Sequence, residues 1–70
     1  MKRINVSSSN LASIGYDENS QILEIEFNNG RIYQYLNVPS IEFQNLKNAN
    51  SHGKYFISKI KDFYQYQQIR

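Results

Sequence analysis

The seventy-residue chain contains no cysteine and no tryptophan, and it has a single histidine and a single proline. Without cysteine it has no disulfide framework and no thiolate metal site, and one histidine cannot fill a zinc site. A chain without cysteine fits a reducing cytoplasm. Its apolar runs are too short to span a membrane, and no signal-peptide run follows its first two bases. We therefore predict a cytoplasmic protein without cofactor, metal or membrane partner.

Signals for catalysis are also scarce. The histidine, His52, stands beside Gly53 in a predicted loop, and no serine lies in a nucleophile elbow. Glu24 and Glu26 are two residues apart on a predicted strand, hence about 6–7 Å apart, a separation that can serve glycoside hydrolysis. Acids at such positions usually face solvent, and a chain of this length leaves little room for a sugar cleft. We predict no catalytic residues and no enzymatic activity.

The length of the chain indicates one small domain spanning residues 1–70. A domain of this size has a small hydrophobic core and is only marginally stable. The net charge is +2, and residues 36–70 carry five bases against two acids. Such a basic bias permits an anionic partner without requiring one. Solvated charges on helices are the ordinary alternative.

The clearest local pattern is a β-hairpin at residues 22–36. In ILEIEF, residues 22–27, Leu23, Ile25 and Phe27 face one way, whereas the two glutamates face the other. Asn29-Gly30 then gives the strongest short-range hairpin signal, and RIYQYL, residues 31–36, supplies the return strand.

The turn leaves two registers open for Tyr33 and Tyr35. A two-residue loop would pair Glu26 with Tyr33 and place both tyrosines on the polar face. A three-residue loop, with Gly30 in the left-handed conformation, would pair Ile25 with Tyr33 and place them on the core face. One residue of register moves every side chain to the other face. The second option gathers five large apolar side chains, so the pattern favours it.

The remaining elements complete a small α+β domain. Residues 10–16 and 63–69 alternate as strands, a helix starts at Pro39, and a second helix is predicted at 54–61. The order β-β-β-α-α-β gives an antiparallel meander with two short helices on one face and a final C-terminal strand. The predicted core contains Leu23, Ile25, Phe27, Phe43, Leu46, Phe56 and Ile60.

Aromatic and basic residues give the best indication of function. Ten of the seventy residues are Tyr or Phe, and rings on a sheet can stack bases while nearby cations hold phosphates. The candidate nucleic-acid-binding residues are Tyr33, Tyr35, Tyr66, Arg31, Lys54, Lys59 and Lys61. If Tyr35 stacks a base, Tyr35→Ala should lose binding and stay folded. The alternative is that the tyrosines belong to the core and the lysines are simply solvated.

Three segments resemble the KTSC domain family: SSSNLASIGYD, LEIEFNNGRIYQYLNVP and NANSHGKYFISKIKDFYQY. The family's central Tyr-x-Tyr marker matches Tyr33-Gln34-Tyr35, and the resemblance extends from about Val6 to Tyr66. The family is named for its place at the C-terminus of some lysyl-tRNA synthetases, and it also occurs as a free-standing small protein in bacteria and phages. The resemblance to a synthetase-associated domain implies RNA as the partner.

We therefore expect a non-enzymatic module that binds RNA or another single-stranded nucleic acid. Two alternatives remain from the sequence. The first is a protein-interaction or self-association module that forms a homodimer, and the second is a binder of small nucleotides that uses the same tyrosines and bases. Salt dependence separates the first expectation from an apolar interface, because phosphate binding weakens steeply as salt rises.

Overall fold

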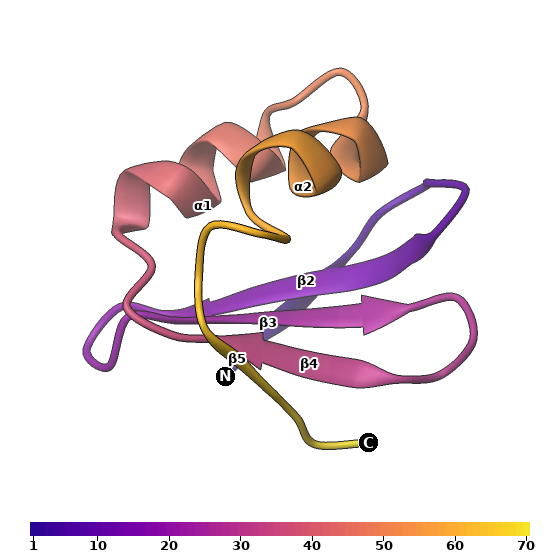
Figure 1. Cartoon of the computed structure of the whole chain (residues 1–70). Helices are drawn as coiled ribbons and strands as arrows, with labels where there is room; N and C mark the ends of the chain where they lie inside the picture. Colours follow the sequence, from indigo (N-terminus) through magenta and orange to yellow (C-terminus); the bar gives the residue numbers. More distant parts are fainter.

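A computed structural model describes all residues, 1–70, as a five-stranded antiparallel sheet with two helices on one of its faces (Figure 1). The strands lie in chain order, β1-β2-β3-β4-β5. The predicted α+β class is confirmed. Neither of the two short helices could span a lipid bilayer. The elements are β1 (Arg3–Asn5), β2 (Leu11–Asp17), β3 (Ile22–Phe27), β4 (Ile32–Tyr35), α1 (Ser40–Lys47), α2 (His52–Lys59) and β5 (Tyr66–Gln68).

The hairpin between β3 and β4 has the three-residue loop that the pattern favoured. The Phe27 N–H donates to the Arg31 carbonyl at 2.9 Å, and the Gly30 N–H donates to the Phe27 carbonyl at 2.9 Å. Gly30 has a φ of +91°, a left-handed conformation that costs glycine little. Ile25 therefore pairs with Tyr33, and both tyrosines of β4 lie on the face that the helices cover.

Strand β2 departs from the simple alternation that the sequence suggested. In a simple alternation of residues 10–16, Leu11 would lie on the face opposite Ile14. The register shifts between Leu11 and Ser13, as it does at a β-bulge, which inserts one extra residue on one strand. Leu11 and Ile14 are consequently both fully buried in the same core.

Six of the seven predicted core residues are buried, and the seventh, Phe27, is only partly buried because it lies at the edge of the core. The core also takes in four residues that were not in the predicted set. They are Leu11, Ile14, Tyr35 and Val38.

One strand was not expected, and two elements start well away from the expected residue. Strand β1 was not predicted, because three residues are too few to show a period. Helix α2 starts at His52 and not at residue 54, since the Ser51 side chain accepts a hydrogen bond from the Lys54 N–H at 3.3 Å and caps the helix. The last strand starts at Tyr66 and not at residue 63.

The late start of β5 follows from the contacts of Tyr64. Its hydroxyl donates to Glu42 Oε2 of α1 at 3.3 Å, while the Tyr55 hydroxyl of α2 donates to Glu42 Oε1 at 2.6 Å. Glu42 thus ties both α2 and the segment after it to α1. Tyr64 is held at the helix layer and cannot also join the sheet.

The face of the sheet without helices carries a polar network. Arg3 Nε of β1 lies 3.5 Å from Glu24 Oε2, and Arg70 Nη2 lies 3.3 Å from Glu26 Oε2. Gln34 Nε2 also donates to Glu24 Oε1 at 2.9 Å. The two carboxylates of β3 are therefore held by cations and amides from the neighbouring strands and the chain end, an arrangement that stabilises the sheet.

Alkaline pH should destabilise the fold. Burial raises the pKa of four phenols, those of Tyr16, Tyr35, Tyr55 and Tyr64, above the usual tyrosine value of 10.0. The folded state therefore favours the neutral phenols. This contribution to stability is complete below pH 10 and is lost as the pH rises above it, because the unfolded chain loses these protons first.

The measurement is the melting temperature by circular dichroism from about pH 9 to about pH 12. We expect a steady fall above pH 10.0, and a shallower fall for the Tyr55→Phe/Tyr64→Phe double variant, which has two fewer such phenols. An identical pH dependence in both proteins would contradict this assignment.

Candidate binding pocket between the sheet and helix α2

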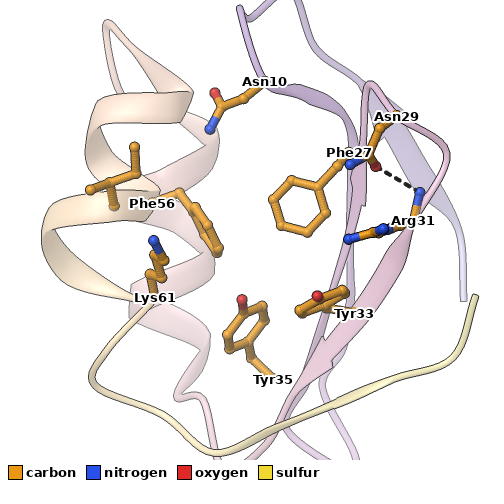
Figure 2. A pocket seen from close by; sticks show the side chains of 9 residues that line it. Asn10, Phe27, Asn29, Arg31, Tyr33, Tyr35, Phe56 and Lys61 are labelled. Atoms are coloured by element: carbon orange, nitrogen blue, oxygen red, sulfur yellow. Dashed lines mark hydrogen bonds between the residues drawn. The ribbon is translucent and has the colours of Figure 1, made fainter.

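An open pocket of about 240 Å³ lies between the β3–β4 hairpin and α2 (Figure 2). The sheet and α2 supply its aromatic walls, and the segment before β2 and the hairpin loop supply amide groups. Its lining residues are Asn10, Phe27, Asn29, Arg31, Tyr33, Tyr35, Phe56, Ile57 and Lys61.

Aromatic rings fix the shape of the pocket. The Phe56 ring of α2 meets Phe27 and Tyr35 edge to face, at centroid distances of 5.6 Å and 5.4 Å. Tyr33 meets Phe27 in the same way at 5.3 Å. Edge-to-face pairs are favourable arrangements of aromatic rings. Because each wall ring is held by another, we infer that the pocket is formed before any ligand binds.

The rings of the three candidate tyrosines stack on one another, but they are exposed to solvent to very different extents. Tyr66 stacks on Tyr33 at 5.2 Å and 13°, and it leans on Tyr35 at 5.4 Å and 38°. Tyr35 is 2% exposed, Tyr33 is half-buried and Tyr66 is 55% exposed. Tyr66 therefore presents the most exposed ring of the three. Tyr35 is a core residue, which removes the basis for expecting Tyr35→Ala to stay folded.

The Tyr35 hydroxyl nevertheless faces the pocket. It forms no hydrogen bond within the protein, and Figure 2 shows it directed into the space between Lys61 and Tyr33. Burial of the ring, followed by the nearby phenol of Tyr66, raises the pKa of Tyr35. The group is therefore a neutral hydroxyl that can donate a hydrogen bond to a ligand.

Two of the four candidate cations lie at the pocket. Arg31 enters from the hairpin and Lys61 from the segment just after α2, on opposite walls (Figure 2). Neither forms an ion pair, since all salt bridges of the chain involve Arg3 or Arg70. No acidic side chain lines the pocket. The lining of the pocket therefore carries only positive charge, although Asp62 lies near enough to Tyr35 for its negative charge to help raise the pKa of that phenol.

The other two candidate lysines lie on different flanks of α2. Lys54 precedes Ile57, which lines the pocket, by three residues of α2, so it lies on the pocket flank of the helix without lining the pocket itself. Lys59 follows Tyr55 by four residues, and the Tyr55 hydroxyl contacts Glu42 of α1. Lys59 therefore lies on the flank that faces α1, away from the pocket.

Sequence reasoning missed the amide groups of the pocket. Asn10 and Asn29 lie in a pre-strand segment and a turn, where asparagine is common for local reasons. Gly53 is the signal that could have drawn attention to Asn10, because the Asn10 side chain packs directly against it at the start of α2. Nowhere in the chain do three His, Cys, Asp or Glu side chains gather as they would around a metal ion.

Comparisons with known proteins agree on one family. The family model of the KTSC domain matches residues 7–66. The crystal structure of a KTSC domain protein from Yersinia pestis matches with a TM-score of 0.93 and 43% identity, over 99% of this chain and 97% of that one. An uncharacterized protein from Stutzerimonas stutzeri is 44% identical over 70 residues, 99% of each chain.

The chain is also similar to part of a larger enzyme. It is 41% identical over 54 residues to a lysine–tRNA ligase from Nostoc sp., and 34% identical over 59 residues to that of Nostoc punctiforme. These matches cover 77% and 84% of this chain but only 10% of each ligase. The chain thus corresponds to about a tenth of the length of those ligases.

Proposed function

The chain belongs to the KTSC domain family, and we propose that it is a non-enzymatic cytoplasmic module that binds single-stranded RNA. The observation that carries the proposal is the pocket, in which aromatic walls stand beside two unpaired cations and no acid. Single-stranded nucleic acids need both features, because their bases stack on rings and their phosphates require positive charge.

The arrangement supports a particular path for the strand. Tyr66 offers its outer ring face to one base, and its inner face is stacked on Tyr33 at 5.2 Å. Arg31 and Lys61 flank the pocket beside this stack and serve the neighbouring phosphates. Lys54, on the same flank of α2, extends the positive surface. In this proposal Tyr35 supports the stack from the core, and Lys59 takes no part.

Similarity to lysine–tRNA ligases adds support for RNA as the ligand. Those enzymes act on tRNA by name, and a segment of about a tenth of their length resembles this chain. A module that holds single-stranded RNA would suit both an enzyme of that kind and a free-standing protein. The similarity does not identify the RNA sequence.

A protein-interaction or self-association module is the second candidate, because apolar side chains lie exposed on α2 and in the turn that follows it. Ile57 of α2 is 52% exposed, and Phe63 of the following turn is 67% exposed. An interface built on these side chains would bury apolar area, and its affinity would change little with salt. For a site that binds phosphates, the logarithm of the binding constant would instead fall linearly with the logarithm of the salt concentration.

The test is fluorescence anisotropy of a labelled single-stranded RNA titrated with the protein at low and at rising salt. We expect binding that weakens steeply with salt. Tyr66→Ala should weaken it by about 1 kcal/mol, the lower end of the range for one lost stack, because one ring face is already covered.

Tyr66→Phe is the matched control, because it keeps the ring and removes only the hydroxyl. It should bind and melt as the native protein does. Tyr66→Ala should stay folded, because Tyr66 is 55% exposed, but it should melt at a slightly lower temperature because its ring stacks on Tyr33 and Tyr35. A folded Tyr66→Ala variant with native RNA affinity would exclude Tyr66 as the stacking residue. No binding by the native protein at low salt would refute the proposed function.

A further inference from the structure

We propose that the Asn10 side chain distinguishes uracil from cytosine in the pocket, by donating a hydrogen bond from Nδ2 to O4 of one unstacked uracil. This inference rests on the proposed function and adds a base preference to it. Three observations support it: the fixed orientation of the Asn10 amide, the room that Gly53 leaves for it, and the hydrogen-bond donors of the other polar side chains in the pocket.

Local hydrogen bonds hold the Asn10 amide in one orientation. Ser8 Oγ donates to Asn10 Oδ1 at 3.1 Å, and the Asn10 N–H donates back to Ser8 Oγ at 3.3 Å. The oxygen of the amide is thereby used within the protein, whereas Nδ2 has no partner there. Figure 2 shows this nitrogen directed down into the pocket, toward the rings of Phe27 and Phe56.

The first turn of helix α2 leaves room for the Asn10 amide. Gly53 stands in the first turn of α2, although glycine disfavours helix more than any residue except proline. A Cβ at position 53 would collide with Asn10 Oδ1 and would lie 3.1 Å from Ser8 Oγ. Glycine therefore lets the Asn10 side chain lie against the helix at the mouth of the pocket.

The other polar groups of the pocket are mainly donors. Arg31 and Lys61 can only donate, and Asn29 Oδ1 already accepts the Arg31 N–H at 3.0 Å. A ligand rich in acceptors is therefore favoured. Uracil presents a keto oxygen at position 4, as thymine does, whereas cytosine presents an amino group that would face the Asn10 donor.

The size of the pocket fits one base. Its volume of about 240 Å³ lies below the range of about 300–1,000 Å³ that is usual for drug-sized ligands. A single pyrimidine can enter with its position-4 edge toward Asn10, and its phosphate then remains outside, near Arg31 and Lys61. This placement continues the strand path that begins at Tyr66.

The experiment compares labelled oligouridylate and oligocytidylate of equal length, which share the pyrimidine ring and differ at position 4. We expect the native protein to bind oligouridylate about three- to tenfold more tightly, as befits one hydrogen bond gained and one donor clash avoided. Asn10→Asp keeps the oxygen that Ser8 contacts and replaces the donor by an acceptor, which accepts from the cytosine amino group and repels O4 of uracil, so this preference should reverse. If Asn10→Asp does not fold, Asn10→Ala removes the amide altogether, and the preference should then disappear.

Asn29→Asp is the matched control. It adds the same negative charge at the pocket and keeps the oxygen that accepts the Arg31 N–H. It should weaken the binding of both oligonucleotides alike and preserve their ratio. Equal native affinity for the two, or a preference that survives in a folded Asn10→Asp variant, would overturn the inference and leave RNA binding intact. Binding of neither at low salt would refute the proposed function itself.

Discussion

Replacement of Tyr35 by alanine is expected to destabilise the domain by about 3–5 kcal/mol, the usual cost of removing a buried aromatic ring. Tyr35 is 2% exposed, and its ring contacts Phe56 and Tyr66 at centroid distances of 5.4 Å in both cases. Small domains are stable by only about 5–15 kcal/mol in total, and a chain of this length lies near the lower end. The variant should therefore be largely unfolded at physiological temperature.

Urea unfolding followed by circular dichroism measures this loss. Tyr35→Phe is the matched control, since it keeps the ring, and the hydroxyl that it removes has no hydrogen-bond partner within the protein. It should unfold close to the native midpoint. A Tyr35→Ala variant with a native midpoint would show that the ring is not part of the core and would restore it as a surface for stacking.

The hairpin shows how far the sequence determines the fold. The alternation of residues 22–27 and the Asn29-Gly30 pair were sufficient to predict two paired strands. They were not sufficient to fix the register, because loops of two and three residues both suit Asn-Gly. Packing against the helices decides between them, since only the three-residue loop brings Tyr33 and Tyr35 to the covered face.

The candidate site was predicted less completely than the fold. Arg31, Lys61 and Tyr33 were recognised as candidates from residue type, and the structure brings all three to one pocket. Asn10 was missed because its partner Gly53 is distant in the sequence and suggested a break before the helix. No local pattern could show that a glycine makes room for a side chain from another element.

Removal of the two pocket cations should have the largest effect on binding. Each of Arg31 and Lys61 is a cation without an acidic partner, and an exposed charge pair of the kind that each would form with a phosphate contributes up to about 1 kcal/mol. Arg31→Ala/Lys61→Ala should therefore weaken RNA binding by roughly 30-fold at low salt. The slope of log K against log salt should also flatten by about 0.7 for each phosphate that the protein no longer neutralises.

A second double variant separates the position of the charges from their number. Lys47→Ala/Lys59→Ala removes the same net charge, but neither residue lines the pocket. Lys47 lies in the last turn of α1, and Lys59 lies on the flank of α2 that faces α1. This variant should lose only the small contribution of general charge. Both double variants should melt as the native protein does, because all four side chains are exposed.

Titration of one labelled single-stranded RNA with both double variants, side by side at low salt, tests most directly whether the pocket binds nucleic acid. We expect a large loss of affinity and a flatter salt dependence for Arg31→Ala/Lys61→Ala, and near-native values for Lys47→Ala/Lys59→Ala. Equal weakening in the two variants would contradict a binding site at this pocket.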